Sequence, residues 1–474
     1  MHKYSNSFAR NLTSFSILTW VSFIISFVSA PISTRIYIPN VLGRINLFNT
    51  YSTMVMSLAY LGLDQAYVRF YNEPPLGKSK ETLFSFCVYT SILSIFITTP
   101  IFLIFYRKFS VAIVGTESIS IVVLLIISSL TGVLIRYLNL QYRMKLDAKW
   151  YTIQGILDIL CVKFSFIITG FFIPSYQIAI FAMTASRFIF GIIFFILQRN
   201  QFVFKDKLYE RLFAKEIAKF ALPLVPITFL SWANSSISQI VLKNMLGFGE
   251  LGIYSMAVGL ASTVNIIQAG FNVYWAPYVY GNYKNKNNNF WQIHKLMVSL
   301  LTLAALAIIA LQDPLFMLLG EKYRPAKSFF PFLLFSPICY TIAETTGLGI
   351  NISKKTYWNI IIFSLNIIIS IIGCYSLIPF FGVSGAAMAS AIAAIVYLAV
   401  RTVIGEKYYR SIQNYKYMSY GIFLLILAAL VNYYAFHNNA LKYSSIMIII
   451  LFSIILFRNE IQYLFSVIKR EVNS

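Results

Sequence analysis

The segment TYWNIIIFSLNIIISIIGCYSLIPFFGVSGAAMASAIAAIVYLAV, residues 356–400, contains no charged side chain. A helix needs about 20 mostly apolar residues to cross the roughly 30 Å hydrocarbon core of a bilayer, so this segment is too long for one crossing. Pro379 and Gly382 lie where a break is required, because proline ends a helix and glycine permits a turn. The segment therefore predicts two consecutive transmembrane helices.

The rest of the chain has the same apolar character. Of its 474 residues, 58% are hydrophobic and 11% are charged, and its mean hydropathy is +0.72. A soluble chain carries about 25% charged residues, so we expect this chain to be surrounded mainly by lipid. A net charge of +22 would suggest a nucleic-acid partner in a soluble protein. Here the charges lie in the loops, which is typical of membrane proteins, and we expect no nucleic acid.

Apolar stretches of spanning length recur along the whole chain. We expect 14 transmembrane helices, at residues 12–33, 45–63, 82–106, 118–135, 150–173, 176–198, 220–242, 251–271, 293–312, 328–348, 356–378, 383–400, 417–436 and 442–457. With the N-terminus inside, 27 of the 38 Lys and Arg residues lie in predicted cytoplasmic loops and nine lie in the opposite loops. This bias predicts that both termini are cytoplasmic. The first apolar run exceeds the signal-peptide core of about 7–15 residues, so we expect an uncleaved anchor.

An internal repeat predicts the domain organisation. Leu42-Gly43 after the first span recurs as Leu246-Gly247 after the seventh, and an even number of spans separates the copies. This pattern predicts two parallel six-helix lobes, a plan that transporters often use, although a chance match in an apolar chain is the alternative. The predicted N-terminal lobe covers residues 1–200 and the C-terminal lobe residues 201–412, and two further spans occupy residues 413–474.

Several kinds of chemistry are not expected from the sequence. The four cysteines (Cys87, Cys161, Cys339 and Cys374) lie in apolar stretches without paired spacing, and the three histidines are scattered. We therefore predict no disulfide frame, metal site or cofactor. The chain also lacks the phosphate-binding motif of ATP-driven pumps.

Ionisable side chains inside the predicted spans, or at a span end as for Arg35 and Asp64, are the candidates for function. Each costs about 2.5–3.5 kcal/mol on insertion scales, so such groups usually face the bundle interior and serve a purpose. The candidates for holding an anionic headgroup in a cavity between the lobes are basic: Arg35, Lys163 and Arg187, with Arg69 and Lys243 as loop residues near the interface. The candidates for taking up a proton or Na⁺ are acidic: Asp64, Asp158 and Glu344. The alternative is that these groups form ion pairs that only pack helices, with Arg187 as the partner of Asp158.

Two further patterns concern helix packing. Pro223 and Pro226 are expected to bend or open the first turns of the seventh span. Small residues that recur on one face of the twelfth span, namely Gly382, Gly385, Ala386, Ala389 and Ala393, predict a close approach to a neighbouring helix.

Four segments carry a resemblance to a known family. They are LGLDQAYVRF (residues 61–70), RYLNLQYRMKLDAKW (136–150), FALPLVPITFLSWANSSISQIVLKNMLGFGELGIYS (220–255) and LIPFFGVSGAAMASAIA (377–393). With these segments the chain resembles the Wzx-type polysaccharide repeat-unit (O-antigen) flippases. Those flippases belong to the multidrug/oligosaccharidyl-lipid/polysaccharide exporter superfamily. The similarity extends from the first to the twelfth span.

The resemblance implies a function and a set of partners. It implies a bacterial inner-membrane flippase that moves undecaprenyl-diphosphate-linked oligosaccharide units for O-antigen or capsule by alternating access. It also implies coupling to a proton or sodium gradient without ATP, with the polysaccharide polymerase machinery as a further partner. Relatives often have an acidic residue where this chain has Gln239, so coupling here would fall to Asp64, Asp158 or Glu344.

There are three alternatives to this function. A multidrug antiporter of the same superfamily should favour acids for cationic drugs, whereas the charges here are mixed and include Lys163 and Arg187. A peptidoglycan-precursor flippase shares the 14-span plan. A membrane glycosyltransferase or polymerase would usually show a large outer loop or an acidic catalytic motif. The longest predicted outer loop, residues 312–327, carries only Asp313 and Glu321 as acids, so we do not expect an enzyme.

Overall fold

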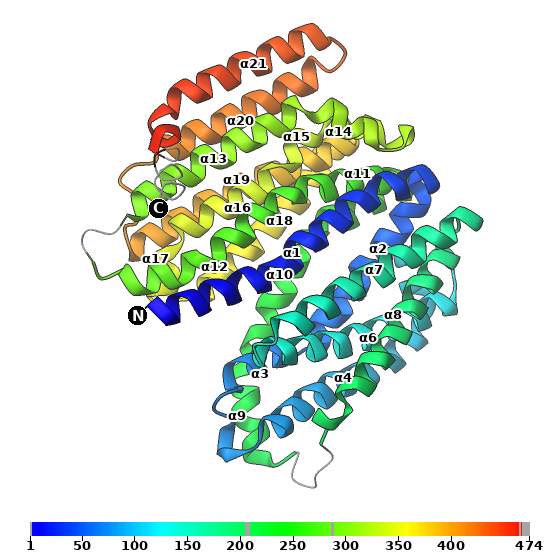
Figure 1. The fold of residues 1–474 in the computed structure, drawn as a ribbon. Helices are drawn as coiled ribbons and strands as arrows, with labels where there is room; N and C mark the ends of the chain where they lie inside the picture. Colours follow the sequence, from blue (N-terminus) through cyan, green and yellow to red (C-terminus); the bar gives the residue numbers. More distant parts are fainter. Residues whose placement is uncertain (1, 204–208, 286–288, 464–465, 467–474) are drawn as a thin grey trace. The chain divides into compact units, whose positions relative to one another are not determined.

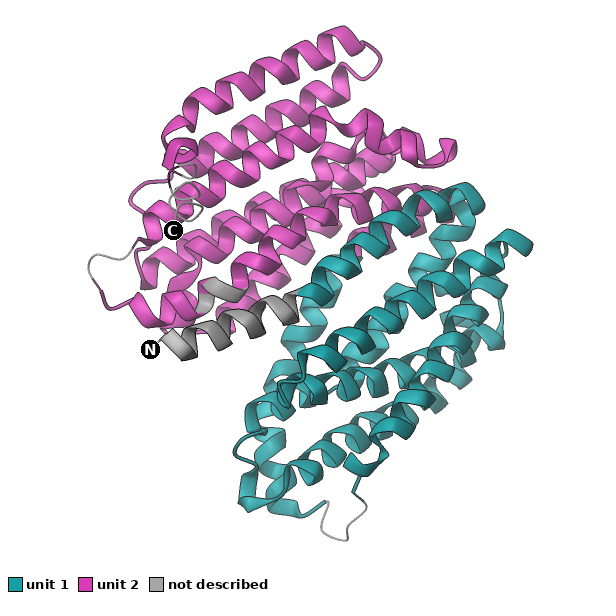
Figure 2. Ribbon diagram, viewed as in Figure 1, with its two compact units in different colours: residues 1–236 teal, residues 237–474 magenta. Residues whose placement is uncertain are grey.

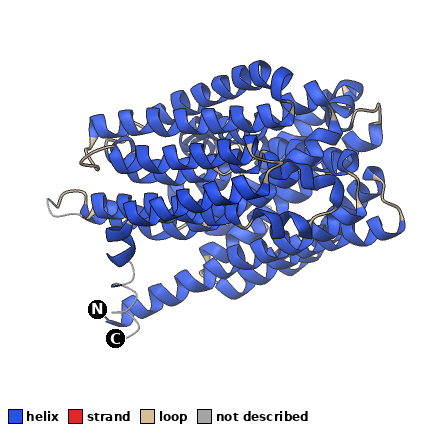
Figure 3. Cartoon of the chain, turned by 90° about the horizontal axis from the view of Figure 1, so that it is seen from above, coloured by secondary structure: helices blue, strands red, loops and turns tan. Residues whose placement is uncertain are grey.

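The computed structural model describes residues 2–203, 209–285, 289–463 and 466 (Figure 1). Every regular element within these residues is helical (Figure 3). The helices form two compact units, Met1–Ser236 and Ile237–Ser474, and the boundary falls within α10 (Val225–Leu246) (Figure 2). The lobes predicted for residues 1–200 and 201–412 remain a prediction, since compactness alone does not establish an internal repeat.

The first unit contains the helices that precede α10. They are α1 (His2–Ile36), α2 (Pro39–Ala59), α3 (Leu63–Phe70), α4 (Lys80–Ile104), α5 (Tyr106–Val114), α6 (Ile119–Met144), α7 (Ala148–Phe172), α8 (Tyr176–Gln198) and α9 (Arg211–Ala221). Helix α7 packs on α1 and α8, while α6 packs on α2, α4 and α8. As predicted, Pro223 and Pro226 lie where a helix is broken, because the 3-10 turn Leu222–Leu224 separates α9 from α10.

The second unit contains the helices that follow α10. They are α11 (Phe248–Ala261), α12 (Asn265–Asn282), α13 (Phe290–Ala310), α14 (Gln312–Leu318), α15 (Phe330–Leu333), α16 (Phe335–Thr346), α17 (Leu348–Ile352), α18 (Tyr357–Phe381), α19 (Val383–Tyr408), α20 (Lys416–Tyr434) and α21 (Asn439–Leu456). Helix α19 packs on α18 and α16, and α13 packs on both α20 and α21.

The charge-free segment forms two antiparallel helices, as its length predicted. Helix α18 keeps Pro379 in its last turn, and the break falls at Gly382, whose φ of 56° lies in the left-handed region that favours glycine. A Cβ at Gly385 would meet the carbonyl oxygen of Leu377 at 2.4 Å, so α18 and α19 approach too closely for a side chain there. The small-residue face therefore packs helices, as expected from the sequence.

The number of spans differs from the predicted 14. Eleven helices of the described chain are long and apolar enough to cross a membrane, or twelve if Glu321–Ser328 and Phe330–Thr346, bent by 71°, count as one span. Helices α2 and α10 are long, but Asn, Ser and Thr side chains lower their hydropathy, and they are not among these candidates. The chain is a multi-pass, all-helical membrane protein, and a count of 14 is not confirmed.

The repeated Leu-Gly motif occupies two different local positions. Leu42 and Gly43 lie in the first turns of α2, which begins at Pro39. Gly247 instead forms the break between α10 and α11 with a φ of 87°. The copies therefore do not mark the same turn, and the repeat as a whole remains a prediction.

Close backbone contact joins α17 to α19, and this contact yields a test of packing. A Cβ at Gly349 would lie 2.0 Å from the carbonyl oxygen of Gly405 and 2.6 Å from the amide nitrogen of Tyr409. Backbone atoms cannot rotate away, so Gly349→Ala is expected to lower the free energy of unfolding by about 1–3 kcal/mol or more. Gly259→Ala in α11 is the matched control, because a Cβ added at Gly259 would meet no heavy atom within 4 Å. The measurement is thermal unfolding in detergent. Equal losses of thermal stability in the two variants would contradict the close packing.

A polar network ties α20 and α21 to the second unit. Asp313 of α14 lies 2.5 Å from the Lys327 ammonium and 3.8 Å from the ammonium of Lys442, which is fully buried, and it accepts a hydrogen bond from Tyr443. The Asn432 amide donates to the Lys327 carbonyl at 3.0 Å. From the sequence, residues 312–327 were assigned to an outer loop and Lys442 was counted among the outer-loop cations. The structure places Asp313 and Lys327 of this stretch in the network with the buried Lys442, whereas Glu321, Lys322 and Arg324 are exposed.

The network predicts a defined pH dependence of stability. Burial disfavours ionisation of Asp313, but hydrogen bonds from Lys327 and Tyr443 and the charges of Lys442 and Lys327 hold its pKa below the ordinary value of 3.8. A pKa that is lower in the folded state adds stability above the ordinary value, and this stability is lost as pH falls through the lowered pKa. Asp313→Asn is expected to lower the free energy of unfolding at neutral pH by about 1–3 kcal/mol. The free energy of unfolding, measured between pH 7 and strongly acidic conditions, should depend less on pH in this variant than in the wild type. The same pH dependence in both proteins would contradict a lowered pKa of Asp313.

Candidate functional site

The predicted partnership of Asp158 and Arg187 is present in the first unit. Asp158 on α7 accepts two parallel hydrogen bonds from Arg187 on α8, Nε to Oδ1 at 3.0 Å and Nη2 to Oδ2 at 3.0 Å. The side chains are 18% and 23% exposed. This two-point geometry is the one in which an Arg–carboxylate pair is strongest. A Cβ on Gly132 of α6 would come within 3.4 Å of the guanidinium, so a third helix borders the pair.

A second ion pair joins α3 to α6. The Asp64 carboxylate, which is 9% exposed, lies 3.6 Å from Arg136 and accepts a hydrogen bond from the Gln65 side chain at 2.8 Å. Leu61 and Gly62 adopt positive φ values of 49° and 73°, and this turn separates α3 from α2. Arg136 was assigned to a cytoplasmic loop, but α6 continues past the predicted end of its span and holds Arg136 as the partner of Asp64.

Tyr60 is an uncharged neighbour of the two pairs. It follows the last residue of α2, packs edge-on against Tyr137 of α6, and lies within electrostatic reach of all four charged side chains of the two pairs. We refer to Asp64, Arg136, Tyr60, Asp158 and Arg187 as the unit 1 charge cluster. The cluster carries two acids and two bases, so it is neutral as it stands. A change in protonation at either acid therefore creates a net charge inside the unit.

Lys163 differs from the other basic candidates within spans. It is half-buried on α7, with its ammonium 5.9 Å from the centre of the Phe166 ring. Within the part of the chain that the structure describes, no carboxylate forms an ion pair with it. Phe166 is itself fixed, because Tyr37 stacks on its ring and donates a hydrogen bond to its carbonyl at 2.6 Å. Lys163 thus lies beside an aromatic ring that is itself held in place, and it has no described acidic partner.

Glu344 belongs to the second unit and is already paired. Its carboxylate lies 3.2 Å from Arg401 of α19, and its backbone carbonyl accepts a hydrogen bond from Trp275 at 3.0 Å. Arg401 is 8% exposed and also donates to the Tyr397 hydroxyl. Arg401 was predicted to lie in a cytoplasmic loop, but it is part of α19, which continues to Tyr408.

The remaining predicted site residues are not members of these pairs. Arg35 is exposed in the last turn of α1, and the exposed Arg69 lies over the ring of Phe70 at 5.7 Å. Lys243 of α10 lies 5.2 Å from the ring of Phe248. Gln239 accepts a long hydrogen bond from Ser255 at 3.4 Å.

Sequence reasoning missed Arg136, Arg401 and Tyr60. Both arginines follow an apolar run directly, and each could have been assigned to a longer helix because an unpartnered acid, Asp64 or Glu344, required a base. Among the described residues, no three His, Cys, Asp or Glu side chains are placed to hold a metal ion.

The fold is that of known membrane transporters. It is similar to the lipid II flippase MurJ in an inward closed conformation, with a TM-score of 0.67 and 16% identity over 97% of this chain and 99% of that chain. It is also similar to a multidrug resistance MATE family transporter of the MOP superfamily. The inward-facing form has a TM-score of 0.54, with 13% identity over 83% of this chain and 94% of that chain. The outward-facing form has a TM-score of 0.53, with 15% identity over 84% of this chain and 94% of that chain.

The family follows from the sequence. The profile of a family described as polysaccharide biosynthesis protein matches residues 8–282, which is more than half of the chain. The chain therefore belongs to the polysaccharide biosynthesis protein family, and the predicted superfamily resemblance is confirmed. No curated protein matches the chain.

Proposed function

We propose that this protein is a flippase for polyprenyl-diphosphate-linked oligosaccharide units of a bacterial surface polysaccharide, either O-antigen or capsule. The observation that carries the proposal is the family match over residues 8–282 together with Lys163, a cation with no described acidic partner inside a helix of spanning length. A cation in a membrane span is costly and usually marks a substrate or ion pathway, and a lipid diphosphate would supply the anionic partner that no described acid provides. The lipid II flippase among the fold relatives is consistent with a lipid-linked substrate.

The unit 1 charge cluster suggests how an ion gradient is coupled to substrate. Arg187 makes with Asp158 the same two-point contact that an arginine makes with a phosphate. The Asp158 carboxylate and the diphosphate of the substrate therefore compete for the Arg187 guanidinium. Protonation of Asp158, or its binding of Na⁺, weakens the pair and makes Arg187 available. By thermodynamic linkage, substrate on Arg187 raises the affinity of Asp158 for the ion. Asp64 with Arg136, and Glu344 with Arg401, are further acids that an ion can neutralise.

The roles of the other predicted residues follow from this assignment. Arg35, Arg69 and Lys243 are proposed as peripheral contacts that attract the headgroup at the membrane surface. We further propose an inner-membrane location with both termini cytoplasmic, transport by alternating access without ATP, no enzymatic activity, and contact with the polymerase machinery.

Deletion of the gene separates the candidate functions. In a strain with intact polymerase and transferases, we expect loss of surface polymer, with single lipid-linked units trapped on the cytoplasmic side. New sensitivity to cationic drugs with unchanged polymer would instead identify a multidrug antiporter, which the MATE-like fold also permits. Accumulation of lipid-linked peptidoglycan precursor would identify a flippase for that substrate.

A further inference from the structure

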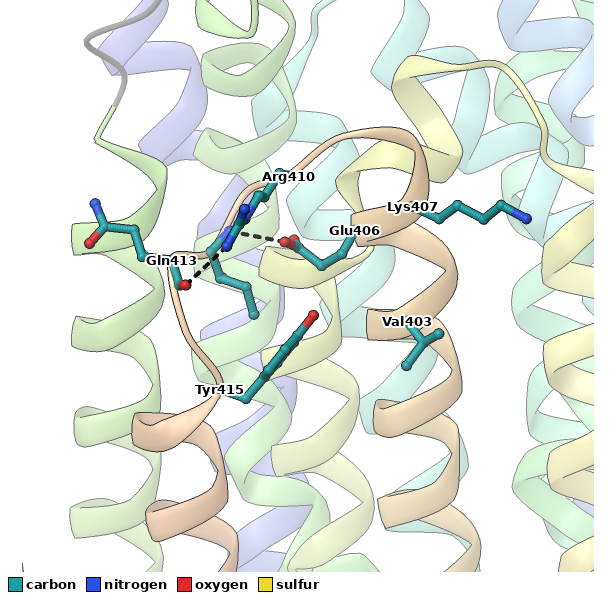
Figure 4. Close-up of a pocket in the computed structure, with 7 residues that line it drawn as sticks. Val403, Glu406, Lys407, Arg410, Gln413 and Tyr415 are labelled. Carbon is teal, nitrogen blue, oxygen red and sulfur yellow. Dashed lines mark hydrogen bonds between the residues drawn. The ribbon is translucent and has the colours of Figure 1, made fainter.

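A pocket lies where α19 ends and α20 begins (Figure 4). Its volume is about 280 Å³, and it is lined by Val403, Glu406, Lys407, Arg410, Ile412, Gln413 and Tyr415. Ligand sites for drug-sized molecules usually measure about 300–1,000 Å³, so this pocket suits a single small headgroup and not an oligosaccharide. None of its residues takes part in the proposed transport mechanism.

The pocket wall is organised by one carboxylate. Glu406 accepts hydrogen bonds from the backbone amide of Ser411 at 2.9 Å and from its hydroxyl at 2.6 Å, with the amide of Ile412 at 3.4 Å. The Ser411 hydroxyl also lies 3.1 Å from the carbonyl of Thr345, which anchors the loop to α16. Glu406 is thus occupied in shaping the loop, and Figure 4 shows its side chain turned toward the loop, away from Lys407.

Two cations border this organised loop. Lys407 and Arg410 are both exposed, and neither forms an ion pair with any carboxylate that the structure describes. The Arg410 guanidinium makes one long hydrogen bond, at 3.4 Å, to the carbonyl of Gln413. Arg410 and Lys407 both line the pocket, but Figure 4 shows the Lys407 side chain extending away from the Arg410 guanidinium. The flexible, exposed Lys407 stem would therefore have to turn for its ammonium to reach an anion held by Arg410, while the Glu406 carboxylate is engaged by the loop. A phosphate group has the oxygens and the charge to contact both.

The other side of the pocket is apolar. Val403 is 67% exposed and the Tyr415 side chain is 51% exposed, at the ends of two helices of spanning length. Tyrosine with an exposed aliphatic neighbour is typical of the interface where headgroups meet acyl chains. The charge bias of the sequence predicts that this end of α19 faces the cytoplasm, where anionic lipids concentrate.

We propose that the α19–α20 pocket is a phosphate-binding site, occupied by the headgroup of an anionic membrane lipid. The shared chemistry of the ligand is a phosphate group contacted by Lys407 and Arg410. The apolar rim favours a lipid-borne phosphate over free inorganic phosphate. This site is independent of the proposed transport substrate, and it would couple the end of α19 to the composition of the surrounding bilayer.

The test compares two matched double variants of the full-length protein. Lys407→Gln with Arg410→Gln removes the pocket cations, and Lys322→Gln with Arg324→Gln removes the same charges from an exposed stretch of the same unit. Delipidated protein is titrated with phosphatidylglycerol, phosphatidylcholine or inorganic phosphate, and binding is counted by native mass spectrometry. Phosphatidylglycerol is expected to bind the pocket variant about tenfold more weakly than wild type, with little change for the control variant. The charge-conserving pair Lys407→Arg with Arg410→Lys should retain binding.

The arms of the experiment identify the source of the phosphate. If inorganic phosphate binds in a manner that depends on Lys407 and Arg410 while phosphatidylglycerol does not, the phosphate site stands and its lipid ligand is overturned. If neither probe distinguishes the pocket variant from the control variant, the proposal is overturned as a whole. Circular dichroism and size-exclusion chromatography check that the variants are folded. We expect them to be, because Lys407 and Arg410 are both exposed.

Discussion

Replacing Lys163 by methionine is expected to reduce transport to a small fraction of the wild-type level while leaving the protein at normal or higher abundance in the membrane. Among the described residues, no carboxylate forms an ion pair with Lys163, so the substitution leaves no acid without its partner. Removing a lone ammonium from a membrane span should ease insertion by an amount on the order of 2 kcal/mol. A hydrogen bond to a charged group contributes about 1.5–3 kcal/mol, so losing a contact to the diphosphate should reduce substrate affinity by about 10–100-fold.

The measurement is surface polysaccharide in a deletion strain that carries each variant, normalised to protein in the membrane. Lys163→Arg keeps the charge and should retain most transport. Lys108→Met, which removes an exposed cation elsewhere in the same unit, should have no effect. Normal polymer with Lys163→Met would show that Lys163 does not hold the substrate. Loss of the protein itself would show that Lys163 serves packing.

Breaking the Asp158–Arg187 pair is expected to have two separable effects. Arg187→Gln leaves Asp158 without its partner in a partly buried position, which should destabilise the protein by about 2–3 kcal/mol, below the range for fully buried pairs. The double variant Asp158→Asn with Arg187→Gln leaves no unpaired charge and should recover most of the lost stability. Transport should remain absent in both variants, because both lack the guanidinium and the double variant also lacks the ion-binding acid.

Abundance and transport measured on the same membranes distinguish coupling from packing at this pair. Recovery of transport along with stability in the double variant would show that the pair only holds α7 against α8. The matched control is Glu117→Gln with Arg107→Gln, an exposed pair 3.4 Å apart in the same unit. Exposed pairs contribute about 0–1 kcal/mol, so this control should change neither quantity.

The all-helical fold class and the positions of most spans could be predicted because the length of an apolar stretch is a local property of the sequence. The charge-free segment shows this well, since its two helices and the break near Gly382 follow from composition alone. The ends of α6 and α19 did not follow in the same way. Each prediction stopped at the first charged residue, whereas α6 continues through Arg136 and α19 through Arg401. Each arginine is accommodated by an acid on another helix, which hydropathy does not register.

The candidate site was predictable only in part for the same reason. Asp158 and Arg187 were matched in advance because a membrane span rarely tolerates either charge alone. The difference between Arg187, which is paired, and Lys163, which has no described acidic partner, depends on how α7 and α8 face each other. Helical spacing indicated in advance only that Lys163, five residues after Asp158, is not its ideal partner on the same helix. The polar composition of α2 and α10 likewise reduced the candidate spans below the predicted number.

The most direct test of the flippase proposal is a transport measurement with purified full-length protein in sealed vesicles. The vesicles contain a polyprenyl-diphosphate-linked oligosaccharide in both leaflets, and a glycan-modifying enzyme that cannot cross the bilayer is added outside. With an imposed proton or sodium gradient, the wild-type protein is predicted to make the inner-leaflet substrate accessible, whereas Lys163→Met vesicles should remain close to protein-free ones. Modification confined to the outer leaflet in wild-type vesicles, together with gradient-driven movement of a cationic drug, would contradict the proposal.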